Sequence, residues 1–130
     1  MLKRDAIRST MPIERSWADL TAEQQGSFRT HYIDMPATDE PPFPLKGTQG
    51  ILKGIRDAAE KLFEVGTLEL TVRIDERGKP VSVQVYETPS QQMTMVAATI
   101  LMNERYKPAL CSARPCVMDF PLYIDFNYRH

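Results

Sequence analysis

The sequence predicts an α+β fold: a small antiparallel sheet of order β-β-α-β, with helices packed on one face and an N-terminal helical extension. The first observation is the change of hydrophobic period at Gly66, from about 3.6 residues before it to about two after it. The second is a charged turn segment, Asp75–Lys79, which separates two alternating segments and predicts a hairpin. The third is a last alternating segment, which follows another helix and ends at Phe126.

An N-terminal helix is predicted to begin after Thr21. Thr21 stands at the N-cap position, and Gln24 follows at the capping-box position. The apolar stripe of this helix, which includes Phe28 and Tyr32, ends before Pro36. Further prolines then exclude helix, so the connection to the next element is expected to be extended.

The clearest helix is expected over residues 49–65. Its apolar residues recur at intervals of three and four positions, which is typical of an amphipathic helix. They are Ile51, Leu52, Ile55, Ala58, Ala59, Leu62 and Phe63. Gly66 is expected to end this helix as the C′ residue, because glycine adopts a positive φ at little cost.

Alternating apolar residues predict three strands that share one buried face. The hairpin strands are expected at residues 67–75 and 81–86, and the final strand at residues 117–126. A third helix is expected to open at Thr88–Ser90 and to close at Glu104 and Arg105. The core is expected to depend on Leu70, Val72, Val83, Ile100, Leu122 and Ile124.

Charge and hydropathy exclude several classes of partner. The chain has 16 basic and 17 acidic residues, a formal net charge of −1, which gives no general attraction to nucleic acid or anionic membrane. No apolar run approaches the roughly 18 residues that a membrane span needs. The charged first residues are not followed by an apolar segment, so no signal peptide or anchor is expected. A cytoplasmic protein and a chain that has lost its targeting segment both stay open.

The sequence gives little support for catalysis. It has two histidines and lacks the H-x-x-x-H, H-E-x-x-H, paired C-x-x-C and G-x-S-x-G patterns of metal and nucleophile sites. Asp119 and Asp125 would lie roughly 20 Å apart on the final strand, too far to exchange a proton. We therefore expect no enzyme activity, no cofactor and no metal. A small-molecule site between sheet and helices is the weakest of the alternatives.

The two cysteines, Cys111 and Cys116, are five positions apart, and this spacing matches neither a redox motif nor a zinc knuckle. From the pair alone, a local disulfide and two reduced thiols are equally expected.

One edge of the predicted sheet is a candidate binding site. The final strand has one expected neighbour, in the hairpin, and its other edge can be open. Open edges bind extended peptides through main-chain hydrogen bonds. The alternative is that the N-terminal flank covers this edge.

Short motifs occur in a fixed order between Pro41 and Phe126. They are Pro42-Phe43-Pro44, the segment Gly66–Asp75 followed by Gly78 and Val81, Ala97-Ala98, Arg105-Tyr106-Lys107-Pro108-Ala109, Pro115, and Ile124-Asp125-Phe126. In these motifs the chain resembles the C-terminal domain of the energy-transducer TonB family. The chain is accordingly divided into an N-terminal helical flank, residues 1–40, and a TonB C-terminal-like domain, residues 41–130.

This resemblance implies a non-enzymatic periplasmic domain of Gram-negative bacteria. Family members bind by pairing a sheet strand with a short extended segment of an outer-membrane transporter. Carried onto the final strand, this implies a protein or extended peptide as partner, bound by Val117, Met118, Asp119, Tyr123, Ile124 and Asp125. A periplasmic location also favours a disulfide between Cys111 and Cys116.

The chain also departs from the family pattern. Thr88-Pro89-Ser90 replaces a frequent Ser-Ser-Gly, Met95 and Val96 stand where an Asp usually precedes the alanines, and residues 1–40 have no counterpart. Because no membrane helix or proline-rich linker is present, energy transmission is not implied, and membrane contact is expected only through a segment outside this chain. The alternative is a free-standing periplasmic structural or interaction protein, or lipoprotein, whose N-terminal helices cover the sheet edge.

Overall fold

The structure, a computed structural model, describes Leu2 and residues 10–126. Its helices are the 3-10 helix η2 (Trp17–Asp19), α1 (Ala22–Arg29), α2 (Gln49–Lys61) and α3 (Gln91–Met102). Its strands are β1 (Phe43–Pro44), β2 (Gly66–Ile74), β3 (Pro80–Glu87), β4 (Tyr106–Lys107), β5 (Ala109–Cys111), β6 (Arg114–Cys116) and β7 (Met118–Phe126). The predicted α+β class is confirmed. Every helix in the described part is too short or too polar to span a bilayer.

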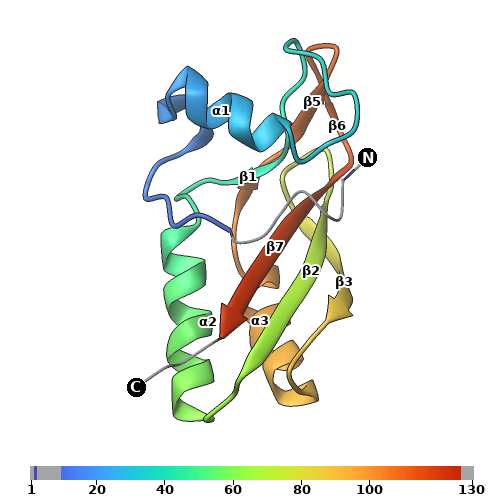
Figure 1. The fold of residues 1–130 in the computed structure, drawn as a ribbon. Helices are drawn as coiled ribbons and strands as arrows, with labels where there is room; N and C mark the ends of the chain where they lie inside the picture. Colours follow the sequence, from blue (N-terminus) through green and yellow to red (C-terminus); the bar gives the residue numbers. More distant parts are fainter. Residues whose placement is uncertain (1, 3–9, 127–130) are drawn as a thin grey trace.

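The main sheet has the antiparallel order β3-β2-β7, with α2 and α3 packed on one of its faces (Figure 1). β2 pairs with β7 over nine residues without a shift in register, from Gly66 opposite Phe126 to Ile74 opposite Met118. The predicted core residues Leu70, Val72, Leu122 and Ile124 are buried, and Val83 and Ile100 are half-buried against them. The predicted sheet faces are therefore confirmed.

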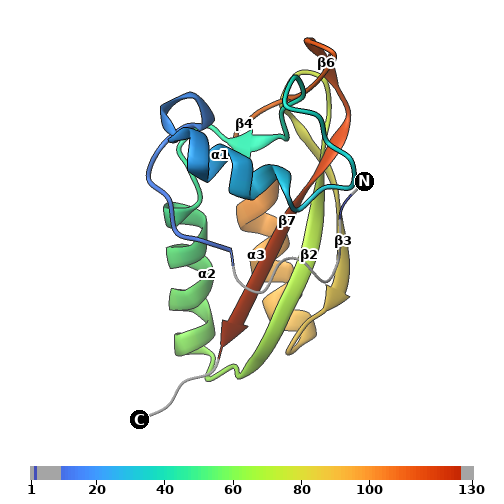
Figure 2. The same ribbon diagram turned by 45° about the horizontal axis from the view of Figure 1, so that its top comes forward.

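The N-terminal residues share this core. Rings of Trp17 and Phe28 lie 5.8 and 5.0 Å from Phe43, and Phe43 lies 6.1 Å from Phe120 of β7, centroid to centroid. This chain of aromatic contacts packs α1 and η2 over one end of the sheet (Figure 2). The division at residue 40 stays a prediction about the sequence, since one hydrophobic core includes residues from both sides of it.

The helix predicted at residues 49–65 ends earlier, at Lys61. The amide of Phe63 donates to the carbonyl of Glu60 at 3.2 Å, and the amide of Glu64 donates to Ala59 at 2.9 Å. These bonds form a Schellman motif in which Phe63, with φ of 54°, takes the C′ position expected for Gly66. The expectation for Gly66 was wrong because that residue already pairs with β7 at the start of β2.

Other boundaries also differ from the predictions. The capping box of Thr21 and Gln24 is present, but α1 ends at Arg29 and leaves Tyr32 outside the helix. α3 ends at Met102, before the predicted Glu104 and Arg105. The expected loop between α3 and the final strand instead contains β4, β5 and β6.

The hairpin of β5 and β6 turns through two residues with positive φ. These are Ser112 and Ala113, with φ of 50° and 67°. Two-residue turns of this kind usually contain Asn-Gly or Asp-Gly, so Ser112-Ala113 carries no turn signal that sequence analysis could use.

Replacing Phe63 with glycine is expected to stabilise the protein by about 1 kcal/mol, because a side chain in the left-handed region costs roughly that much. Little packing is lost, since Phe63 is 91% exposed. Urea unfolding should show a higher midpoint with an unchanged slope. Phe63→Ala, which removes the ring but keeps Cβ, is the control and should show no such gain. A lower midpoint for Phe63→Gly would show that the ring stabilises the fold.

Candidate functional site

The outer edge of β7 is contacted by an N-terminal residue. The amide of Tyr123 donates to Oγ1 of Thr10 at 2.8 Å, and the carbonyl of Tyr123 accepts from the amide of Thr10 at 2.9 Å. Tyr123 thus directs both backbone groups away from β2. Because this direction alternates along an antiparallel strand, Asp119, Pro121 and Asp125 share it. Pro121 fits here because its missing N–H faces outward and costs no bond to β2.

A second N-terminal contact lies nearer the start of β7. The hydroxyl of Tyr32 donates to the carbonyl of Asp119 at 2.9 Å, and Tyr32 also forms an antiparallel bridge with Leu2. Tyr32 is buried, and burial together with the Asp119 charge raises the pKa of its phenol. Tyr32 therefore stays a neutral donor at physiological pH. Two outward positions of β7 are thus occupied by residues of the chain itself.

The predicted partner-binding residues fall into two groups. Val117, Met118 and Asp119 line a cleft at the start of β7. Tyr123 and Asp125 lie further along the edge and direct backbone groups outward. Ile124 is fully buried, so its side chain belongs to the core and its backbone groups point to β2.

The cleft has a volume of about 490 Å³ and combines apolar and charged groups. Its lining residues are Leu2, Tyr32, Arg73, Val117, Met118 and Asp119. Arg73 of β2 lies directly opposite Asp119 in the register, and its Nε donates to Oδ1 of Asp119 at 3.0 Å. This hydrogen bond and the carboxylate charge raise the pKa of Arg73, which stays positively charged.

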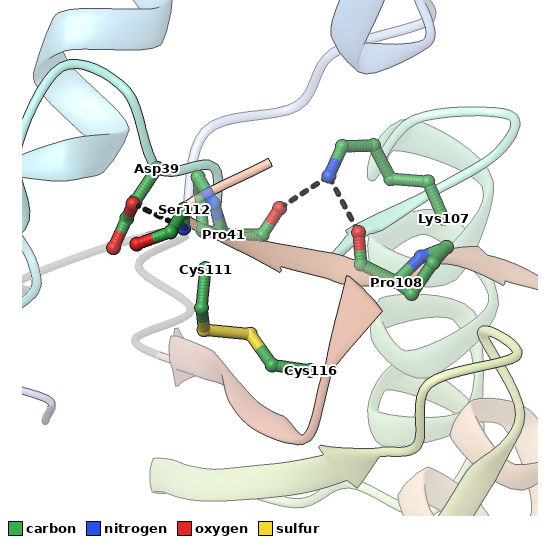
Figure 3. The surroundings of a disulfide bond; sticks show 7 residues. All are labelled: Asp39, Pro41, Lys107, Pro108, Cys111, Ser112 and Cys116. Carbon is green, nitrogen blue, oxygen red and sulfur yellow. Dashed lines mark hydrogen bonds between the residues drawn. A yellow bond between two sulfur atoms is a disulfide. The ribbon is translucent and has the colours of Figure 1, made fainter. Parts of the chain in front are cut away.

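The hairpin of β5 and β6 leads directly into this cleft and is closed by a disulfide. Cys111 and Cys116 are bonded, with their Cα atoms 5.9 Å apart, so the predicted pairing is confirmed (Figure 3). The partner of the hairpin is the extended segment before β1. Glu40 exchanges two main-chain hydrogen bonds of 2.9 Å with Leu110, and Oδ1 of Asp39 accepts from the amide of Ser112.

Lys107 also contacts the extended segment before β1. Its Nζ donates to the carbonyls of Pro41 and Pro108 at 2.8 and 2.7 Å (Figure 3). The same Nζ lies 3.4 Å from the carboxylate of Glu40. Burial lowers the pKa of Lys107, and the nearby Glu40 opposes that shift. The ammonium also lies 5.7 Å from the centroid of the Trp17 ring. Lys107 therefore has structural partners rather than a free, reactive amine.

The described residues contain no group of three or more acidic, histidine or cysteine side chains that could hold a metal ion. In the described part of the chain, Nδ1 of His31 is a buried polar atom without a hydrogen-bond partner. Burial lowers the pKa of His31 and keeps its imidazole neutral near pH 7.

Sequence reasoning missed three residues of this region. Tyr32 was assigned to the apolar stripe of a helix, and Thr10 carried no signal. Alternation along the strand places Arg73 on the face away from the core, but its pairing with Asp119 depends on the register between β2 and β7.

Removing the hydroxyl of Thr10 is expected to expose the amide of Tyr123. In Thr10→Ala that amide loses its acceptor, and hydrogen exchange at Tyr123 should become about fivefold faster, because such a bond is worth about 1 kcal/mol. The amide of Ile124, which bonds toward β2, is the internal control and should keep its rate. Unchanged exchange at Tyr123 would contradict this contact.

Removing the disulfide is expected to destabilise the fold. The double variant Cys111→Ser, Cys116→Ser should lose ~2 kcal/mol of unfolding free energy, since a short closed loop no longer restricts the unfolded chain. Urea unfolding of the oxidised protein, the reduced protein and the double variant measures the effect. The reduced protein should behave as the double variant does. Equal midpoints for all three samples, or free thiols in the oxidised protein by mass spectrometry, would refute it.

Comparison of the chain with family models, curated proteins and solved structures gives no match. Membership of the TonB family is therefore a proposal that depends on the ordered motifs and on the geometry of β7.

Proposed function

We propose that this chain is a TonB-like periplasmic domain that binds an extended segment of a protein partner by adding a strand to β7. The observation that carries the proposal is the pair of hydrogen bonds between Tyr123 and Thr10. A donor and an acceptor of the edge are already satisfied by a residue from outside the sheet. An extended peptide would satisfy the same two groups with its own backbone.

The regularity of β7 favours this edge over the opposite one. β7 pairs with β2 without a register shift, so its outward groups keep a regular spacing, apart from the N–H that Pro121 lacks. In contrast, the register between β3 and β2 shifts twice, at Val81 near one end of β3 and at Tyr86 near the other. Irregularities of this kind twist an edge and hinder strand addition.

The contacts of β7 support one path for the proposed partner segment. It replaces Thr10 at Tyr123 and continues to Asp125. At Asp119 the Tyr32 hydroxyl already occupies the carbonyl, so the segment leaves the edge there and crosses the cleft. Val117 and Met118 then contact its side chains.

The disulfide and the motif order support the periplasmic location. Disulfides form and persist in oxidising compartments, of which the bacterial periplasm is one. The bond between Cys111 and Cys116 lies between α3 and β7, which stand where the TonB family has its helix and its final strand. A role in transport, as in the transducer family, is proposed only if the partner that the domain binds is itself a transporter.

The alternative function is a structural or interaction protein in which the N-terminal residues keep the β7 edge closed. The hydrogen bonds of Thr10 and Tyr32 favour it, because both positions are occupied in the free chain. The two functions differ in one measurable respect, which is whether an added peptide displaces Thr10.

Extended ten-residue peptides from the N-terminal segments of outer-membrane transporters are expected to shift the amide resonances of Tyr123 and Asp125. In Thr10→Pro, which removes both the donor and the hydroxyl, affinity should rise by about tenfold, since the peptide no longer competes for two hydrogen bonds. Titration followed by NMR measures both effects.

Two variants of Tyr123 serve as controls. Tyr123→Pro should abolish peptide binding, because it deletes the outward N–H. Tyr123→Thr should retain binding, because affinity comes mostly from the backbone. If the peptides shift neither amide in the native chain or in Thr10→Pro, edge docking is excluded and the alternative function stands.

A further inference from the structure

We propose that Arg73 selects a carboxylate-bearing residue in the segment that binds to β7. This inference rests on the proposed function, which supplies the bound segment. What it adds is the chemical class of the side chain that enters the cleft. Arg73 would be a specificity-determining residue, and Asp119 would position it.

Arg73 and Asp119 lie where two hollows meet. The larger is the cleft described above, and the smaller, of about 150 Å³, lies on the same face of the sheet. Both are lined by Arg73 and Asp119, and the smaller is completed by Thr71, Ser82 and Gln84. A side chain that enters either hollow therefore meets the same guanidinium.

The hydrogen bond to Asp119 orients this guanidinium without consuming its terminal donors. Asp119 accepts from Nε, and no acceptor among the described residues bonds to the terminal nitrogens, whose N–H groups form a planar fork suited to a carboxylate. The side chain of Arg73 is 57% exposed, so an incoming group can reach it. The side chain of Asp119 is 27% exposed and is held as the inner member of the pair.

The charges of the two hollows favour a single carboxylate. Among the described lining residues, Arg73 is the one cation, and Asp119 already balances part of its charge. The other polar groups of the smaller hollow are hydroxyls and an amide, which can donate to an oxygen. A phosphate or a cluster of acidic residues would need more positive charge than this face offers.

The β7 register indicates where the acidic residue lies in the bound segment. Side chains directly opposite each other across two strands point to the same face. A carboxylate directly opposite Asp119 would be repelled by it, whereas a residue opposite Pro121 shares the face of Arg73 without that repulsion. A glutamate at this point reaches toward Arg73 as the segment crosses the cleft.

The first test uses a small probe and does not require strand addition. Capped glutamate (N-acetyl-glutamate N-methylamide) is titrated while the Nε–Hε resonance of Arg73 is followed by NMR, with capped glutamine as the neutral match. Glutamate should shift this resonance and glutamine should not. The backbone amide resonance of Asp119 should shift in the same titration, and that shift should be lost in Arg73→Gln and kept in Arg77→Gln, which removes an equal charge at the exposed hairpin turn.

The second test uses a transporter peptide that binds in the titration above. Replacing its glutamate with glutamine should weaken binding by about tenfold in the native chain, as expected for one charge-assisted contact. The same replacement should have no effect in Arg73→Gln. Urea unfolding of that variant checks that the exposed pair is not needed for the fold.

The outcomes separate this inference from the proposed function. If peptides bind but glutamate and glutamine peptides bind equally, the proposed function stands and the selection by Arg73 is overturned. If no peptide binds and capped glutamate still shifts Arg73, the carboxylate site stands and strand addition fails. If capped glutamate and capped glutamine act alike on Arg73, the carboxylate site is overturned.

Discussion

The uninterrupted pairing of β2 with β7 is the constraint on which the rest of this structure depends. Nine consecutive residues of each strand face each other in one register, so every side chain of β7 has a fixed face. On one face this buries alternate apolar residues under α2 and α3, and burial of such side chains is the main source of stability. On the other face it places Arg73 against Asp119. A slip of one residue would exchange the two faces and lose both arrangements.

The N-terminal residues are held to this sheet by aromatic packing rather than by strand pairing. Trp17 and Phe28 contact Phe43, which contacts Phe120 of β7, and each side chain is buried. Two cations, Arg29 and Lys107, lie 5.5 and 5.7 Å from the Trp17 ring. This cluster holds η2 and α1 at one end of the sheet, and the flanking residues Thr10 and Tyr32 contact the outer edge of β7.

Under the proposed function, Thr10 competes with the partner for the edge of β7. A partner that forms hydrogen bonds with Tyr123 must first displace Thr10, and the affinity it shows is lowered by the fraction of time the edge is closed. Opening requires the loss of the two hydrogen bonds between Thr10 and Tyr123 and the exposure of Thr10, which is buried.

The sequence by itself determined the elements whose signals are local. The change of period at Gly66, the turn at Asp75–Lys79 and the capping box at Thr21 all depend on neighbouring residues, and each is present in the structure. The buried face of the sheet was predictable for the same reason, because alternation along a strand needs no knowledge of its partner. The position of the strand edge could be inferred as well.

Tertiary structure alone decided the contacts within the candidate site. The contacts of Thr10 with Tyr123, of Tyr32 with Asp119 and of Arg73 with Asp119 join residues separated by 113, 87 and 46 positions. Such contacts leave no periodic pattern, since they depend on the register of two strands and on where the aromatic cluster holds the N-terminal residues. The C′ position of Phe63 was not predictable for a related reason. Pairing with β7 places Gly66 at the start of β2, so α2 ends before Gly66 and Phe63 takes the left-handed conformation.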